Sequence, residues 1–192
     1  SLPEFIAARF DINGEANIPT WYSTILLFSV SAASLLIYGL ALRLPQNGQR
    51  LRAFWLGFGL IYAFFSLDEA AMLHEIFDRL TEVKWLYVYA PLIGLFYLVS
   101  LYYYFVIRKE DRVVRNWIVV GLVVFAFGGI VCEWYAYTFR PPYAFRHIEY
   151  VLEEGSEMMG TVMVLIGCLL EFKEKFGKVF SAAAASTDAA PN

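Results

Sequence analysis

Two stretches of the chain, residues 21–42 and 85–107, contain no ionisable side chain other than tyrosine. A helix of about 20 apolar residues spans the hydrocarbon core of a bilayer. Because that core holds no water to bind backbone groups, an α-helix is the structure expected for each stretch. The two stretches therefore predict a membrane protein. The composition agrees, since 17% of the 192 residues are charged, whereas a soluble domain carries about a quarter.

Three further segments, residues 53–80, 116–139 and 147–170, also have the length of a membrane span. The segment 116–139 is interrupted by Glu133 alone among acids, and the other two are apolar at one end and rich in carboxylates at the other. The sequence thus predicts an all-α fold, a polytopic bundle of five transmembrane helices. We expect an extracytoplasmic segment at 1–20, a five-helix membrane domain at 21–171 and a low-complexity tail at 172–192. The Ala/Ser-rich part of that tail, 181–192, should be disordered on its own.

The basic residues outside the apolar stretches divide unequally between the two ends of the predicted bundle. Five lie on the side of the N-terminus: Arg9, Arg79, Lys84, Arg140 and Arg146. Ten lie on the opposite side: Arg43, Arg50, Arg52, Arg108, Lys109, Arg112, Arg115, Lys173, Lys175 and Lys178. Loops rich in Lys and Arg stay in the cytoplasm. We therefore expect the N-terminus outside, the C-terminus in the cytoplasm and the lipid bilayer as the first partner.

Acidic residues gather near the outer ends of three predicted spans. They are Asp68, Glu69 and Glu75, beside His74, in 53–80, then Glu133 in 116–139, and Glu153, Glu154 and Glu157 in 147–170. An ionisable group at the centre of a span costs roughly 2.5–3.5 kcal/mol. At 1.5 Å per residue, the acids of the three segments lie at matched depths, roughly 8–10 Å and 15–18 Å below the outer surface. We expect the three helices to bring these carboxylates into one pocket.

The helical positions of these residues predict which of them face that pocket, at about 100° per residue. Asp68 and Glu75 share one face of a continuous helix, while Glu69 and His74 point roughly 100° to either side. In 147–170, Glu153, Glu154 and Glu157 belong to a single polar stripe that we expect to turn into the bundle. Glu149 points away from that stripe and is expected to be solvated.

Carboxylates with one or two imidazoles are ligands for iron, manganese or zinc. Helical bundles build di-metal centres from inward-facing glutamates, and Glu154-x-x-Glu157 has a usable spacing, although no Glu-x-x-His occurs. The leading hypothesis is a carboxylate-rich metal site, either a redox or hydrolytic centre or a structural ion. Its expected ligands are Asp68, His74, Glu75, Glu133, Glu153, Glu154 and Glu157. At such a centre, a metal-bound water or dioxygen would be the reactive species.

Three alternatives stay open from the sequence. Stacked acids could form a proton or cation pathway, but the inner half of each predicted span offers almost no ionisable group for the remaining steps. The acids and nearby arginines could instead fix helix register, or dock a neighbouring chain, in a noncatalytic subunit of a larger membrane complex. A bis-histidine haem fits less well, because His74 and His147 differ in depth by roughly 8–10 Å. Whether Glu69 and His147 join the site is left open.

The charge balance and the positions of the cysteines exclude a nucleic-acid partner and a disulfide. The formal net charge is −3, with 15 basic and 18 acidic residues. Such a balance provides no cationic excess for a nucleic-acid backbone, so no nucleic-acid partner is expected. The two cysteines, Cys132 and Cys168, lie roughly 20 Å apart in depth, which is beyond the reach of a disulfide. Both are expected to be packing residues.

Several short segments together resemble a known group of sequences. They are FDINGE at 10–15, IPTWYS at 18–23, LDEAA at 67–71 with His74-Glu75, and Glu153-Glu154 with Glu157. Over most of residues 10–170 the combination resembles a family of small multi-pass bacterial membrane proteins that has no assigned activity. The resemblance implies a location in the bacterial cytoplasmic membrane, and it implies no reaction.

Overall fold

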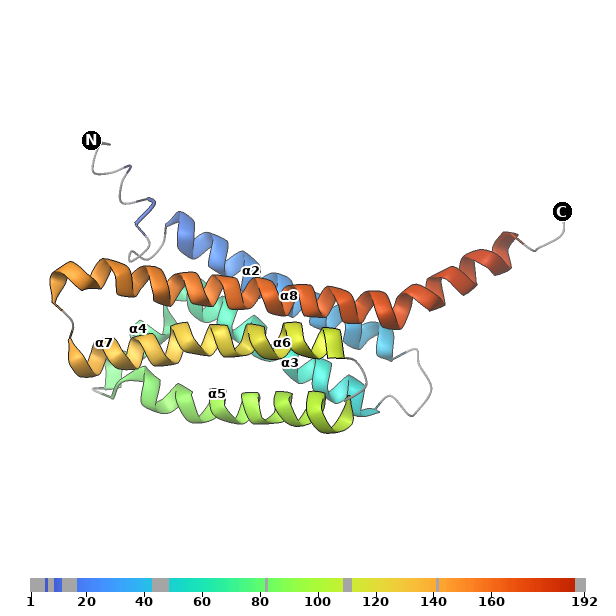
Figure 1. Ribbon diagram of the computed structural model, residues 1–192, viewed down its shortest axis with the longest axis horizontal. Coiled ribbons are helices and arrows are strands. Elements are labelled where there is room, and N and C mark those ends of the chain that lie inside the picture. The colour runs from blue at the N-terminus through green and yellow to red at the C-terminus, as the bar shows by residue number, and fades with distance from the viewer. Residues whose placement is uncertain are drawn as a thin grey trace.

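The computed structural model describes residues 6, 9–11, 17–42, 49–81, 83–108, 112–140 and 142–188. Within these residues the secondary structure is helical (Figure 1). The helices are α2 (Ile18–Ala41), α3 (Gln49–Ala71), α4 (Leu73–Thr81), α5 (Trp85–Tyr102), η2 (Tyr103–Ile107), α6 (Arg112–Ala126), η3 (Phe127–Cys132), α7 (Glu133–Phe139) and α8 (Tyr143–Asp188). The all-α fold expected from the sequence is therefore confirmed.

Within the described part of the chain, five helical segments are long and apolar enough to cross a membrane. They cover Ile18–Ala41, Gln49–Ala71, Trp85–Ile107, Arg112–Phe139 and Phe145–Gly177. The third coincides with the predicted 85–107, and the others differ from the predicted spans mainly at their ends. The fold is thus compatible with an integral membrane protein. Its long helices run side by side, and α4 and α7 lie at the end of the bundle where α2 begins (Figure 1).

The longest helix, α8, organises the bundle. It packs against α2 on one side and against α6 and η3 on the other, while α2 also packs along α3. The α6–α8 contact is close because Gly121 meets Gly160, where an added Cβ on Gly121 would lie 2.8 Å from the Gly160 carbonyl oxygen. Small residues permit such close approach of apolar helices in membranes. By contrast, α5 approaches the backbones of α4 and α6 only over short stretches and continues directly into η2.

The predicted second span, 53–80, is wrong as one continuous helix. The chain breaks at Met72, which has a φ of 53°, so that α3 ends at Ala71 and α4 starts at Leu73. A residue with a side chain in the left-handed region costs roughly 1–2 kcal/mol. The Asp68 carboxylate offsets part of this cost, since its Oδ1 accepts a hydrogen bond of 2.9 Å from the backbone N–H of His74 in the first turn of α4. This cap fixes the corner between the two helices.

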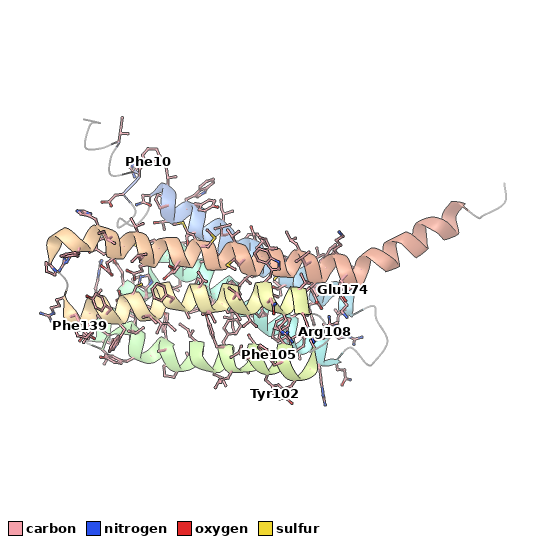
Figure 2. The ribbon with its side chains drawn as sticks, in the orientation of Figure 1. Phe10, Tyr102, Phe105, Arg108, Phe139 and Glu174 are labelled. Carbon is pink, nitrogen blue, oxygen red and sulfur yellow. The ribbon has the colours of Figure 1, made fainter. Side chains whose placement is uncertain are left out.

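Aromatic rings fill the bundle away from that corner. Phe54 and Tyr103 stack at 3.7 Å between centroids, and Trp55, Phe58, Tyr62 and Tyr104 are buried around them. At this end Glu171 is fully buried, and its Oε2 lies 3.2 Å from a guanidinium nitrogen of Arg108. Figure 2 shows Arg108 and Glu174 at the end of the bundle opposite Phe139. Glu171 lies one residue beyond the predicted fifth span but within the apolar helix Phe145–Gly177.

The C-terminal part of α8 extends past the other helices (Figure 1). Helix α8 continues to Asp188, so residues 181–188 are helical, although the sequence analysis expects this tail to be disordered on its own. A run of alanines explains the difference, because alanine has the highest intrinsic helix propensity and here extends an existing helix without a new nucleus. Residues 189–192 lie outside the described part of the chain.

Candidate functional site: an acidic cavity

A cavity of about 450 Å³ opens among α3, α4, α5, η3, α7 and α8. Eight acidic side chains line it: Asp68, Glu69, Glu75, Asp78, Glu133, Glu153, Glu154 and Glu157. Two permanently basic side chains, Arg79 and Lys84, and the imidazole of His74 lie among them. The lining is therefore strongly acidic in composition.

All seven residues of the expected metal site line this one cavity. The structure therefore brings Asp68, His74 and Glu75 together with Glu133 of α7 and with the three glutamates of α8. Glu69, which the sequence left open, also lines the cavity, whereas His147 is exposed and does not line it. Asp78 and Lys84 also line the cavity, although neither was expected there from the sequence. Metal binding by these residues is a separate question and stays a prediction.

The Asp68–His74 pair lies where α3 turns into α4. Nδ1 of His74 is 2.9 Å from Oδ2 of Asp68, and the hydroxyl of Tyr89 is 3.4 Å from Oδ1 of the same carboxylate. The expectation that Asp68 and His74 point in different directions is wrong, because it assumed a continuous helix through Met72. Asp68 is thus engaged as a helix cap and as the partner of an imidazole, which reduces its availability as a metal ligand.

Two acids of α4 are paired with nearby cations. Oε2 of Glu75 lies 2.6 Å from a guanidinium nitrogen of Arg79, one turn further along the same helix. Oδ2 of Asp78 lies 2.7 Å from Nζ of Lys84, and Oδ1 accepts a hydrogen bond of 2.6 Å from the backbone N–H of Trp85. The hydrogen bond to Asp78 raises the pKa of Lys84. Glu75 was among the first expected ligands, yet here it is engaged by Arg79.

Glu157 occupies the side of the cavity formed by η3. Gly128 and Gly129 face it, and a Cβ added to Gly129 would lie 2.7 Å from Oε1 of Glu157. These two glycines belong to a π-helical turn, a feature that is frequent at functional sites. Apolar side chains complete the lining, namely Leu27, Phe65, Ile93, Phe125 and Ile130. The rings of Phe65 and Phe125 stack with their centroids 5.8 Å apart. They form an apolar wall between the cavity and the aromatic core.

A second polar cavity, of about 420 Å³, adjoins the first. It is lined by Lys84, Glu133, Ala136, Tyr137, Arg140, Arg146, Glu149 and Tyr150, of which Lys84, Glu133 and Tyr150 line both cavities. Glu149 is 9% exposed, and its Oε1 has no hydrogen-bond partner among the described residues. The expectation that Glu149 is solvated is therefore wrong. Glu149 is buried and lines this cavity together with Ala136 and Tyr137 of α7.

The carboxylates surround the cavity without forming a ready ligand set. Among the residues that the structure describes, no group of three or more His, Cys, Asp or Glu side chains lies close enough to hold a metal ion. Three of the acids are engaged by His74, Arg79 and Lys84. The arrangement is that of a wide anionic chamber, in which a bare ion would meet its ligands only after side chains had rotated.

The fold and the cavity define a class: an all-α bundle with five apolar helices, compatible with an integral membrane protein, that carries an acidic chamber near one end. The chain belongs to the family described as Domain of unknown function (DUF8692), whose family model matches residues 2–172. This assignment agrees with the resemblance to a family without an assigned activity. No curated protein and no solved structure matches the chain.

Proposed function

We propose that this chain is an integral protein of the bacterial cytoplasmic membrane that binds a cation in the acidic cavity from the extracytoplasmic side. The observation that carries the proposal is the composition of one cavity of about 450 Å³, which eight acidic and two basic residues line. The distribution of Lys and Arg supports the orientation, because the end of the bundle opposite the cavity is the more basic.

Electrostatics explains why a cation is the expected ligand. Carboxylates placed near one another and shielded from water destabilise each other's charged forms. A bound cation lowers the energy of the whole group, whereas an anion would add to the repulsion. Removing several carboxylates from water without compensation would cost several kcal/mol per ion. A cavity with this lining therefore favours either a bound cation or shared protons, and the two compete.

A divalent metal is the finer form of this proposal. Iron, manganese or zinc would be held by Glu133, Glu153, Glu154 and Glu157, which line the same cavity and offer carboxylate ligands. Glu75 and Asp68 would join only by leaving Arg79 and His74. The absence of a preformed three-ligand group among the described residues makes a larger or hydrated cation fit the chamber better than a bare metal ion.

Metal analysis and calorimetry on detergent-purified protein test the proposal. We expect Mn²⁺ or Zn²⁺ to bind to the wild-type protein with weakened binding in Glu154→Gln and in Glu157→Gln. Glu174→Gln is the matched control, since Glu174 is an exposed glutamate of the same helix at the opposite end of the bundle (Figure 2). If neither metal ions nor organic ammonium ions bind, or if all three variants behave alike, the proposal is wrong.

A noncatalytic role in a larger membrane complex is the second candidate. The observation that favours it is the extension of α8 to Asp188, past the other helices of the bundle (Figure 1). The last turns of α8, which lie beyond the other helices that the structure describes, offer a surface for another chain. Truncation after Gly177 would then release copurifying subunits while leaving cation binding unchanged.

A further inference from the structure

An apolar groove of about 510 Å³ lies between α3 and α5 and meets the acidic cavity. Phe65, Tyr89 and Ile93 line both hollows, so the two adjoin across these three side chains. We propose that together they form one site for a single-chain cationic amphiphile, with its amine or quaternary ammonium head in the acidic cavity and its hydrocarbon tail in the groove. This inference rests on the proposed function for the head and adds the chemical class of the ligand.

The groove has the shape and lining that a hydrocarbon chain requires. Its walls are aliphatic and aromatic: Ala53, Phe54, Gly57, Phe58, Leu60, Ile61, Phe64, Phe65, Tyr89, Leu92, Ile93, Leu95, Phe96, Val99 and Ser100. Along α3 it extends from residue 65 to residue 53, which is about 18 Å at 1.5 Å per residue. It therefore leads from the level of the acids toward the aromatic core at the other end, and it accommodates a tail of lipid length.

The groove is open along the side of the bundle. Leu60, Leu92, Leu95 and Val99 line it and are exposed large apolar side chains. The backbones of α5 and α3 also make no substantial contact, so side chains rather than closely packed backbones border the groove. In a bilayer this side faces acyl chains, and an amphiphile could enter sideways without crossing the headgroup region with its tail.

Tyr89 marks the boundary between the two parts of the site. Its hydroxyl lies 3.4 Å from the Asp68 carboxylate, and its ring packs on Phe64 at 5.8 Å between centroids. The ring of Trp85 packs on that of Tyr89 with the centroids 5.4 Å apart. Aromatic faces attract ammonium groups at such positions, so these rings suit the junction of a cationic head and an apolar tail.

A separate observation supports a cationic head. Glu149 is 9% exposed with an Oε1 that lacks a hydrogen-bond partner among the described residues, and it faces the adjoining polar cavity that shares Glu133 and Tyr150 with the acidic one. A buried carboxylate oxygen without a donor is costly. A positive charge in the acidic cavity, beside the shared Glu133 and Tyr150, would offset part of this cost electrostatically, even where the head is a quaternary ammonium without an N–H to donate. An anionic or neutral head would leave the acids uncompensated.

The membrane setting determines which measurement is informative. A tail gains little by moving from lipid to an apolar groove, because lipid chains are as apolar as leucine. The tail contributes to binding by fitting closely against the groove and by placing the head in the acidic cavity. Blocking the groove is therefore a sharper test than lengthening the tail alone.

Two glycines allow that test. Gly57 lines the groove, and an added Cβ there meets no atom within 4 Å; Gly94 of α5 has the same free space but does not line the groove. The protein would be placed in phosphatidylcholine nanodiscs, and binding of radiolabelled hexadecyltrimethylammonium, tetramethylammonium and hexadecanol measured, with the long-chain compounds expressed as mole fractions of the bilayer. We expect one saturable hexadecyltrimethylammonium site per chain and none for hexadecanol.

Gly57→Phe should weaken binding of the long-chain cation about tenfold, as expected for an overfilled apolar site. It should leave tetramethylammonium binding unchanged, and Gly94→Phe should change neither. If Gly57→Phe is not monodisperse, Gly57→Leu replaces it. Equal effects of the Gly57 and Gly94 variants, or saturable binding of hexadecanol, would overturn the inference. If tetramethylammonium still bound in that case, the proposed function would stand. If neither ammonium compound binds, the inference is wrong, and if Mn²⁺ and Zn²⁺ also fail to bind, the proposed function is wrong as well.

Discussion

Glu157 and Gly129 fit against each other so closely that the glycine cannot acquire a side chain without moving the glutamate. A Cβ on Gly129 would lie 2.7 Å from Oε1 of Glu157. We therefore expect Gly129→Ala to displace the carboxylate and to weaken cation binding several-fold while the bundle stays folded. Calorimetric titration with Mn²⁺ measures the affinity, and circular dichroism the helix content.

Gly155→Ala is the control for this prediction, because a Cβ at Gly155 meets no atom within 4 Å. It should leave cation affinity unchanged and stabilise α8 by about 0.5–1 kcal/mol through helix propensity. Unchanged affinity in Gly129→Ala would show that the position of Glu157 has no bearing on binding.

The corner at Met72 gives a prediction on stability. Met72 has a φ of 53°, which glycine adopts without steric cost. Relief of the backbone strain should stabilise Met72→Gly, but the larger backbone entropy of glycine in the unfolded chain cancels part of this effect. The net stabilisation should therefore be up to about 1 kcal/mol. Met72→Ala keeps the strain and should give no gain. Unfolding in mixed micelles compares the two, and equal midpoints would contradict the assigned strain.

The helix cap formed by Asp68 gives a prediction about local stability. Asp68→Ala removes the acceptor for the backbone N–H of His74 and the partner of its imidazole. Loss of a helix cap costs about 0.5–2 kcal/mol. We expect faster hydrogen exchange in α4, measured by mass spectrometry, with little change in the deeper part of α8. Uniform exchange throughout the chain would indicate that the cap does not act locally.

At the other end, Glu171 should be essential for stability. It is fully buried and pairs with Arg108. Removing one partner of a buried pair leaves an uncompensated charge, which costs about 3–5 kcal/mol. Glu171→Gln should therefore unfold at much lower denaturant concentration, whereas Glu174→Gln should stay within about 0.5 kcal/mol of wild type. In Arg108→Met/Glu171→Gln much of the loss should be recovered, and an additive loss would contradict the pairing.

The Lys84–Asp78 pair predicts a pH dependence. The hydrogen bond to Asp78 raises the pKa of Lys84, so the stabilisation it contributes is complete below the ordinary lysine pKa of about 10.4 and is lost as the pH rises through the raised value. Asp78→Asn should lower the pKa of Lys84 and increase its acylation at pH 9–10, quantified by peptide mass spectrometry. Lys173, an exposed lysine on α8, is the internal control. Equal labelling of Lys84 in both proteins would contradict the prediction.

The sequence predicted the helices well because their apolar length is a local property. It also predicted that Glu133 of α7 and Glu154 of α8 meet in one pocket, since depth follows from the count of residues along a helix. It failed where a helix ends for tertiary reasons. No glycine or proline marks Met72 as a corner, so the relation of Asp68 to His74 was misplaced. The burial of Glu149 was missed because the position of α7 beside α8 is not encoded in either segment alone.

The corner at Met72 also separates residues that line the acidic cavity from residues that hold the long helices together. Helix α4 has nine residues and none of them is buried, yet it carries His74, Glu75 and Asp78 at the acidic cavity. Its side chains can therefore change without disturbing the packing among α2, α3, α6 and α8. Within this architecture, ligand preference can diverge among descendants through a short peripheral segment while the long helices keep their interlocking surfaces.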